Sequence, residues 1–274
     1  MASIDPRHLA GEIASAYRDR REIPTLSSRD SAFDVDAAYA VDAELVKRRR
    51  ADGHRTVGRK VGFANKAMWR ALKLDTLVWA PMYDDTVRYA GDGLSTLSIA
   101  KMMSPKIEPE IVFKLRRPLE PGAEDAAAVL DSVEWLALGF EIIDCVFPDW
   151  KFQPADFVAS LGLHAALVVG APLEIESSMI PALAEALPRF KVRLMKNGEL
   201  VEEGSGKNSL RSPALCLGEL GAAIARRAGA EPLAAGELIS SGTLTTSRPI
   251  AAGERWSAAV DGLDVAALTV DVYS

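Results

Sequence analysis

Apolar and polar residues alternate along residues 106–115, and this period of two predicts a β-strand. The alternation places Glu108 and Glu110 on the same face of that strand. That face is either a polar surface in contact with solvent or one wall of a site. Pro109 cannot donate a backbone hydrogen bond to a neighbouring strand, so it predicts an edge strand or a β-bulge, and a bulge can aim side chains into a site.

A second apolar run, over residues 135–143, predicts another strand and contains a single acidic residue near its end, Glu141. A carboxylate among apolar neighbours is rarely buried without a partner. The partner is either an arginine or lysine in an ion pair, or a divalent cation. Because two further glutamates lie on a candidate neighbouring strand, the pattern favours a cation bound by Glu108, Glu110 and Glu141.

The N-terminal part of the chain has the start and stop signals of two helices. Asp5 and Pro6 mark the start of the first helix, and Asp34 is the candidate N-cap of a second helix that ends at Gly53. Residues 24–31 are expected to form the loop between them. The later part of the chain is rich in predicted strands, so the expected fold class is α+β.

Glycines on both sides of Lys60 interrupt a short predicted strand over residues 57–63. Glycine inside a strand marks a bulge or the close approach of a ligand to the backbone. Lys60 is therefore either a surface lysine on an edge strand or a lysine in a pocket. The aromatic and apolar segment at residues 76–83, which includes Trp79, predicts a core loop or a pocket wall.

Residues 147–157 are expected to form a loop, and residues 157–170 a strand or a pair of strands that includes His164. His164 is either a core histidine with satisfied hydrogen bonds or the one imidazole available for acid–base chemistry. Asn-Gly at positions 197–198 and Asp-Gly at positions 261–262 are hairpin signals.

Small hydroxyl residues end a predicted strand over residues 236–243, which closes with Gly242 and Thr243. Backbone N–H groups beside such a cluster can hold a substrate carboxylate, although a plain strand end has the same composition.

Composition narrows the chemistry further. The chain has 274 residues, of which 49% are hydrophobic and 26% charged, and its net charge of −6 gives no support for nucleic-acid binding. With only three histidines, a histidine-rich zinc site is excluded, so a metal would be held by oxygen, as Mg²⁺, Mn²⁺ and Ca²⁺ are. Cys145 and Cys216 have no metal-ligand spacing and are expected to be buried free thiols.

No apolar stretch is long enough to span a bilayer, and charged residues interrupt the N-terminus before any signal-peptide core. The expected protein has no membrane segment and lies in the cytoplasm.

Four segments of the sequence together resemble the fumarylacetoacetate hydrolase superfamily, in its branch of 2-hydroxypentadienoate hydratases and 4-oxalocrotonate decarboxylases. The order and the separations of these segments also match. The segments are Gly58-Arg59-Lys60-Val61-Gly62, Ile107-Glu108-Pro109-Glu110-Ile111, Phe140-Glu141-Ile142, and residues 236–243 with Gly253-Glu254-Arg255-Trp256.

The resemblance implies a mixed β-sheet roll with peripheral helices, in which residues 1–55 form a helical N-terminal arm or cap and residues 56–274 form the catalytic domain. It implies Mg²⁺ or Mn²⁺ held by the three glutamates, with a 2-oxo acid or its enol chelating the ion, which stabilises enolate charge. Lys60 matches a pocket lysine that assists proton transfer or enolate binding, and Thr243, next to Gly242, matches the position that holds the substrate carboxylate.

Two departures from the hydratase pattern leave the reaction open. Hydratases of this family usually carry an acidic residue where this chain has Val78-Trp79-Ala80, and an Asp-Asn pair near residues 160–164. These changes place Trp79 among the candidate substrate-binding residues and His164 among the candidate catalytic residues.

Four functions follow from the resemblance and these departures. The leading one is a metal-dependent lyase, a hydratase of a 2-hydroxypenta-2,4-dienoate-type acid. The enzymatic alternatives are a decarboxylase of a vinylogous 2-oxo diacid and a C–C hydrolase of an acylpyruvate-like diketone. A fourth is a non-catalytic partner subunit of a pathway decarboxylase. A homo-oligomer, with such a decarboxylase as an added partner, is expected.

Overall fold

The structure is a computed structural model of the chain, and it describes residues 5–119 and 125–274, so residues 1–4 of the predicted arm lie outside it. The helices are α1 (Pro6–Asp19), α2 (Leu26–Arg29), α3 (Val35–Ala51), α4 (Lys66–Leu72), α5 (Ala126–Leu130), α6 (Pro154–Ala159), α7 (Ile180–Ala186) and α8 (Pro213–Arg226). Short 3₁₀ helices are η1 (Pro148–Trp150), η2 (Leu161–Leu163), η3 (Ser177–Met179) and η4 (Gly206–Asn208).

The described residues also form fourteen strands. They are β1 (Thr56–Gly62), β2 (Val78–Tyr83), β3 (Val87–Tyr89), β4 (Leu94–Ser98), β5 (Lys106–Leu115), β6 (Val133–Ile143), β7 (His164–Val169), β8 (Leu173–Glu174), β9 (Lys191–Lys196), β10 (Glu199–Ser205), β11 (Leu238–Ser240), β12 (Arg248–Pro249), β13 (Arg255–Asp261) and β14 (Leu268–Tyr273).

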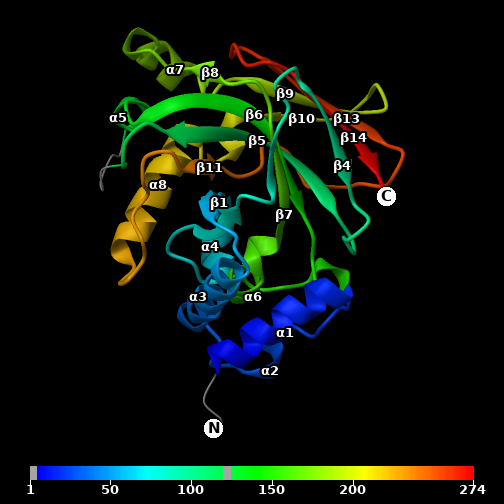
Figure 1. Ribbon diagram of the computed structural model, residues 1–274. Helices are drawn as coiled ribbons and strands as arrows, with labels where there is room; N and C mark the ends of the chain where they lie inside the picture. Colours follow the sequence, from blue (N-terminus) through cyan, green and yellow to red (C-terminus); the bar gives the residue numbers. More distant parts are fainter. Residues whose placement is uncertain (1–4, 120–124) are drawn as a thin grey trace.

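These strands build two curved sheets with helices at their periphery (Figure 1). The nine-stranded sheet has the order β2-β1-β11-β5-β6-β7-β3, with β12 beside β5 and β8 beside β6. The five-stranded sheet has the order β10-β9-β13-β14-β4. Parallel pairs such as β1 with β11 lie next to antiparallel pairs such as β5 with β6, so the prediction of an α+β fold with a mixed sheet is confirmed.

The two predicted N-terminal helices are present with the predicted caps. The carboxylate of Asp5 accepts hydrogen bonds from the first turn of α1, and that of Asp34 accepts one from Ala37 in α3. The prediction of a plain loop at residues 24–31 was wrong, because α2 forms there. Ser27 of α2 donates its backbone N–H and its hydroxyl to Asp156 of α6, so the turn is stabilised by a distant residue.

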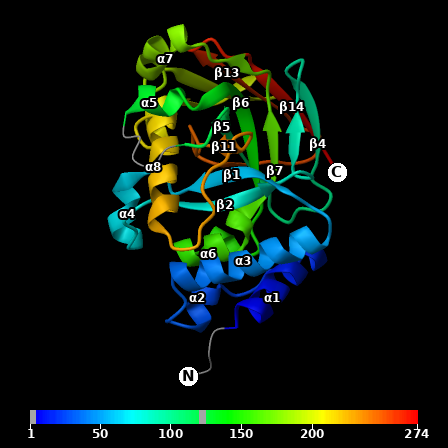
Figure 2. The ribbon, with the colours of Figure 1, turned by 60° about the vertical axis from the view of Figure 1, so that its left-hand side comes forward.

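The N-terminal helices share a hydrophobic core with α6. Ile13 and Val41 belong to the same buried cluster as Phe147 and Val158. In both ribbon views α1, α2, α3 and α6 lie together at one end of the molecule, below the sheets (Figure 2). The arm is thus packed against the segment that follows β6.

Strand β5 lies inside the sheet and is not bulged at Pro109, so the prediction of an edge or a bulge there was wrong. Pro109 pairs in register with Phe140 of β6, and its carbonyl accepts a hydrogen bond from Leu244 on the other side. The nitrogen and the carbonyl of a strand residue point the same way. The missing N–H of Pro109 therefore faces the loop between β11 and β12 and costs the β5–β6 ladder nothing.

Other predicted boundaries were also wrong. Residues 147–157, predicted as a loop, contain η1 and most of α6. Asp156 caps the N-terminus of α6, because its carboxylate accepts the N–H of Gln153. Residues 157–170, predicted as strand, are strand only from His164, because residues 161–163 have positive φ angles that break the extended backbone.

Three further predictions concern the segment with Trp79 and the two predicted hairpins. The segment with Trp79 is not a loop but strand β2, all of whose residues are buried. The Asn197-Gly198 hairpin joins β9 and β10 as predicted. The turn at Asp261-Gly262 is longer than predicted, since β14 begins only at Leu268.

Both cysteines are buried and free, as predicted. Among the described residues no helix has the length and apolar character needed to cross a membrane.

Candidate metal centre

Strands β5 and β6 bring Glu108, Glu110 and Glu141 together. One carboxylate oxygen from each lies within 4.8 Å of the others. Glu108 and Glu141 are directly opposite in the antiparallel register, which puts both side chains on one face of the sheet. Glu110, two residues further along β5, shares that face. Glu110 and Glu141 are 1% and 0% exposed, whereas Glu108 is partly exposed.

The two carboxylate oxygens of Glu141 have different surroundings. Oε1 accepts from the ammonium of Lys60 at 3.0 Å and lies 2.9 Å from Nδ1 of His164. Oε2 is buried and has no hydrogen-bond partner among the described residues. Although burial by itself acts to raise it, Lys60 and His164 lower the pKa of Glu141.

Glu108 and Glu110 are shifted in the opposite direction. Burial, to which the charge of Glu141 adds, raises the pKa of Glu108 to about 7, although Lys60 opposes that rise. Burial also raises the pKa of Glu110 well above its usual value, and the charges of Glu141 and Glu108 add to it. The hydroxyl of Ser240 and the backbone N–H of Gly242 donate to Oε2 of Glu110, at 2.5 and 2.8 Å.

This donor set fits a hard divalent cation. It consists of three carboxylates, the ligand type that Mg²⁺ and Mn²⁺ prefer. The unpartnered Oε2 of Glu141 needs a donor or a cation, because a buried acceptor left alone is costly. Burial and the repulsion between neighbouring carboxylates raise the pKa values of Glu108 and Glu110. A bound cation would stabilise their ionised forms.

Lys60 is buried beside these acids, so a surface position on an edge strand is excluded. It is 2% exposed, and β1 lies between β2 and β11. Its ammonium donates to Glu141 and to the carbonyl of Gly162, the latter at 2.9 Å, and lies 4.9 Å from the ring centre of Phe157. Two of its three N–H bonds are used, which leaves one for the cavity that Lys60 lines.

A cavity of about 490 Å³ opens in front of the acids. One wall is apolar and consists of Phe63, Met68, Ile143, Trp150, Phe152, Phe157 and Leu163. Sequence reasoning missed Trp150, Phe152 and Phe157, because they lie in segments predicted as a loop and as part of a strand. Glu202 and Asn208 also line the cavity, and they were missed because the distant strand β10 and η4 supply them.

Gly242 and Thr243 line the same cavity. Gly242 has φ of +92°, and a Cβ at this position would lie 2.8 Å from the Cβ of Ala64, so the turn requires glycine. The hydroxyl of Thr243 donates to the carbonyl of Thr245 at 2.9 Å. Two of the three predicted substrate-binding residues thus belong to the loop whose backbone N–H group at Gly242 donates to Glu110.

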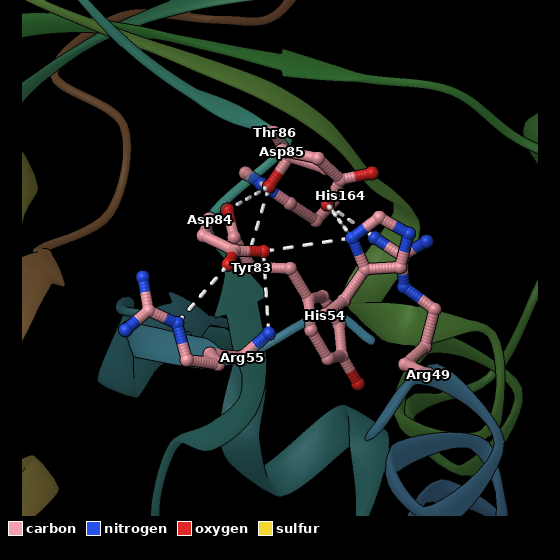
Figure 3. Close-up of polar contacts among 8 residues, drawn as sticks. All are labelled: Arg49, His54, Arg55, Tyr83, Asp84, Asp85, Thr86 and His164. Atoms are coloured by element: carbon pink, nitrogen blue, oxygen red, sulfur yellow. Dashed lines mark hydrogen bonds and ion pairs between the residues drawn. The ribbon is translucent and has the colours of Figure 1, made fainter. Parts of the chain in front are cut away.

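The structure places His164 behind Glu141 rather than on the wall of this cavity. Its Nε2 lies 3.0 Å from the hydroxyl oxygen of Thr86, so both ring nitrogens have partners (Figure 3). The imidazole therefore contacts a carboxylate of the centre and has no nitrogen turned to the cavity.

Trp79 is separated from the cavity by the sheet. In the β1–β2 register Trp79 is opposite Val61, whereas Lys60 is opposite Ala80. Directly paired residues share a face, so Trp79 and Lys60 point in opposite directions. The ring of Trp79 lies against Tyr39 of α3, with centroids 4.7 Å apart.

Comparisons with known proteins agree with this architecture, although no family model matches the chain. The chain is 29% identical over 250 residues to 2-hydroxyhexa-2,4-dienoate hydratase of Comamonas testosteroni, covering 90% of each chain. It is 28% identical over 257 residues to 4-oxalocrotonate decarboxylase of Pseudomonas sp. (strain CF600), covering 93% of this chain and 92% of that one.

Solved structures show the same fold. 4-Oxalocrotonate decarboxylase from Pseudomonas putida G7, complexed with magnesium and adipate, superposes with a TM-score of 0.86 at 24% identity, covering 97% of both chains. Fumarylpyruvate hydrolase from Pseudomonas aeruginosa, in complex with Mn²⁺ and pyruvate, has a TM-score of 0.58 at 16% identity, covering 80% of this chain and 89% of that one.

The chain therefore shares its fold with 4-oxalocrotonate decarboxylase and fumarylpyruvate hydrolase, and with yeast ynq8, a fumarylacetoacetate hydrolase family protein. The sequence relatives are 2-hydroxypentadienoate-type hydratases and 4-oxalocrotonate decarboxylase, and the resemblance found in the sequence is confirmed.

Proposed function

We propose that this chain is a divalent-metal-dependent lyase that adds water to a 2-hydroxy-2,4-dienoate, giving a 4-hydroxy-2-oxo acid. The observation that carries the proposal is the three-glutamate centre: the buried Oε2 of Glu141 has no partner among the described residues, and Glu108 and Glu110 line the same cavity as Lys60. Relatives over most of the chain are hydratases of such dienoates.

Glu108, Glu110 and Glu141 would hold Mg²⁺ or Mn²⁺, the ions named in the related structures. When bound, the ion supplies a positive charge that stabilises the enolate of a chelated 2-oxo acid. Lys60 has one N–H left for the cavity, so it is placed to bind the enolate oxygen or to pass a proton. We assign the substrate carboxylate to the loop end at Gly242 and Thr243, and its chain to the apolar wall.

Hydration is favoured over decarboxylation by the charges around the cavity. Among the described residues that line it, Lys60 is the one basic side chain, and Glu141 already pairs with it. The second carboxylate of a vinylogous 2-oxo diacid would meet Glu202, apolar side chains and neutral polar ones such as Asn65 and Asn208, instead of a second cation. Decarboxylation stays the second candidate because of the 28% identity to 4-oxalocrotonate decarboxylase.

The other two functions have less support. A C–C hydrolase needs a base to activate water, and His164, the imidazole considered for that role, is not on the cavity wall. A non-catalytic partner subunit has no need for three clustered acids, two of them buried, because that burial is costly without a cation.

Loss of the dienoate's ultraviolet absorbance tests the proposal. Protein treated with EDTA is mixed with 2-hydroxypenta-2,4-dienoate, and we expect the absorbance to decay only after Mg²⁺ or Mn²⁺ is added. In a parallel reaction, 4-oxalocrotonate is supplied and carbon dioxide is measured. No decay with a panel of dienoates would exclude hydration, and rapid release of carbon dioxide would establish the decarboxylase instead.

We further propose that the chain forms a homo-oligomer and binds a pathway decarboxylase as an added partner. We also propose that residues 1–55 form an arm or cap and that residues 56–274 form the catalytic domain. Light scattering of the purified chain, alone and mixed with such a decarboxylase, tests the assembly. A particle with the mass of one chain, 29.4 kDa, in both samples would contradict it.

A further inference from the structure

A chain of side-chain hydrogen bonds leads from the metal centre away from the cavity. We propose that Thr86 and His164 are positioning residues, which fix Glu141 so that its Oε2, and not its Oε1, is the oxygen offered to the metal. The inference rests on the proposed metal site and adds to it two residues that do not touch the substrate.

The first link is the imidazole against Glu141. Nδ1 of His164 lies 2.9 Å from Oε1, the oxygen that also accepts from Lys60 at 3.0 Å. An ionised carboxylate only accepts hydrogen bonds, so Nδ1 must carry a proton. Two donors on Oε1 occupy that oxygen and hold the plane of the carboxylate, and the buried Oε2 is left without a partner.

The second link is the hydroxyl of Thr86 against Nε2 of His164, at 3.0 Å (Figure 3). The hydroxyl of Thr86 also contacts the carbonyl of Tyr83 at 2.9 Å, so it holds the ring in place without deciding which nitrogen carries the proton. Without this partner the ring loses the contact that fixes its orientation against Glu141. The side chain of His164 is only 2% exposed.

Thr86 is itself held rigidly. Its backbone N–H donates to Tyr83 at 3.0 Å, and its carbonyl accepts the N–H of Leu167 at 2.9 Å. Leu167 in turn pairs with Glu141 across β6 and β7. The hydroxyl of Thr86 and the carboxylate of Glu141 are therefore anchored to the same strand residue, from opposite sides of the ring that joins them.

The hydrogen-bonded residues Thr86 and His164 lie away from the cavity proposed for the substrate. Thr86 and His164 line a different cavity, of about 510 Å³, bounded by residues of α1 and α3 such as Tyr17 and Leu45. Neither residue lines the cavity in front of the acids. Their effect on the reaction would thus pass through Glu141, which defines a positioning role.

Metal affinity and the ring signals of His164 test the inference independently of turnover. We compare Thr86→Val, which keeps the shape and removes the hydroxyl, with Thr86→Ser, which keeps the hydroxyl. Outer residues that orient metal ligands change affinity by about 10–100-fold. We expect Thr86→Val to raise the Mn²⁺ dissociation constant, measured by electron paramagnetic resonance, by about tenfold or more, and Thr86→Ser to restore it.

Nitrogen NMR of the metal-free protein gives the second readout. The chain has three histidines, His8, His54 and His164, so their ring signals can be assigned by single substitutions. We expect the wild type to show a protonated Nδ1 at His164, and Thr86→Val to shift or broaden the ring signals, because the ring is no longer held in one orientation against Glu141. The control is Thr76→Val, which removes a hydroxyl bonded to Glu219 and should change neither readout.

The outcomes separate this inference from the proposed function. If the wild type shows the Nδ1 signature but binds no Mn²⁺, the proposed metal site fails. If it binds Mn²⁺ and Thr86→Val leaves both the dissociation constant and the ring signals of His164 unchanged, the positioning role is overturned. Should Thr86→Val not fold, His164→Asn, which keeps an N–H donor, is compared with His164→Leu, and equal Mn²⁺ affinities would overturn it.

Discussion

Two groups of side chains in this molecule meet the same distance requirement for binding a metal ion. Glu108, Glu110 and Glu141 do so inside the large sheet, and His54, Asp84 and Asp85 do so at the turn between β2 and β3. We call the first the glutamate centre and the second the turn cluster. Figure 3 shows the turn cluster together with the arginines around it.

The two groups differ in how their charge is balanced. In the turn cluster Arg49 pairs with Asp85, and Arg55 pairs with Asp84, so each carboxylate has its own guanidinium. In the glutamate centre the ammonium of Lys60 is shared by all three carboxylates, and Lys106 adds its charge only at Glu108. Distance between ligand atoms is thus a weak criterion by itself, and the uncompensated buried charge is what favours a cation.

The pKa shifts separate the two groups in the same way. A hydrogen bond from the backbone N–H of Arg55 lowers the pKa of Asp84, with its side chain and His54 adding to the effect. Burial raises the pKa values of Glu108 and Glu110. The folded chain therefore favours the ionised form of Asp84 in the turn cluster and disfavours that of Glu108 and Glu110 in the glutamate centre, until a cation is present.

Replacing one ligand of the glutamate centre gives the largest expected effect. Glu141→Gln removes one negative charge while keeping the size of the side chain. The bound ion contributes several kcal/mol to transition-state stabilisation, so we expect kcat/KM for the dienoate to fall by about 10³-fold or more.

Steady-state kinetics and Mn²⁺ titration measure this fall. Asp85→Asn is the matched control, because it removes one charge from the turn cluster, and its Mn²⁺ affinity should equal that of the wild type. A Glu141→Gln variant that retains both affinity and turnover would show that the glutamate centre is not the metal site.

The pH dependence of stability gives an intermediate effect. In the metal-free folded protein, the raised pKa values of Glu108 and Glu110 favour their protonated forms. In the unfolded chain, the same two groups lose their protons above the ordinary glutamate pKa of 4.5. A folded state that binds more protons than the unfolded state loses stability as pH rises, up to the folded pKa, which is about 7 for Glu108. We expect the Tm of the EDTA-treated protein to fall between about pH 5 and about pH 8.

Two comparisons assign this fall to the glutamate centre. Glu110→Gln removes one of the shifted groups, so its Tm should fall less over the same range. Mn²⁺ at the high-pH end should raise the Tm of the wild type by binding the folded state. Equal slopes for the wild type and Glu110→Gln would assign the pH effect to other groups, such as Asp42, whose burial raises its pKa to about 7.

Local patterns in the sequence were sufficient for the elements that present the acids. The alternation in β5 places Glu108 and Glu110 on one face, because a strand has a period of two, and the apolar run of β6 marks Glu141 as an acid among buried neighbours. The caps at Asp5 and Asp34 are equally local. These features depend on residues a few positions apart, which a single sequence displays directly.

Features that depend on distant partners were not predictable. Trp79 faces away from Lys60 because of the register between β1 and β2. His164 lies behind Glu141 because β7 pairs with β6, and its second partner, Thr86, comes from the turn before β3. Helix α6 is stabilised by contacts with the N-terminal arm that no local pattern in it reveals.

The smallest effect is expected at the turn cluster, where Asp85→Asn breaks the ion pair with Arg49. Side chains in this pair are 41% and 26% exposed, and exposed pairs contribute only about 0–1 kcal/mol. We expect the free energy of unfolding in urea to change by less than about 1 kcal/mol, with no change in Mn²⁺ affinity. Asp85 directly precedes Thr86, however, so this variant also tests whether the two groups are independent. A loss of Mn²⁺ affinity comparable to that expected for Thr86→Val would mean that the turn cluster holds the hydroxyl in place, and that the two groups act as one unit.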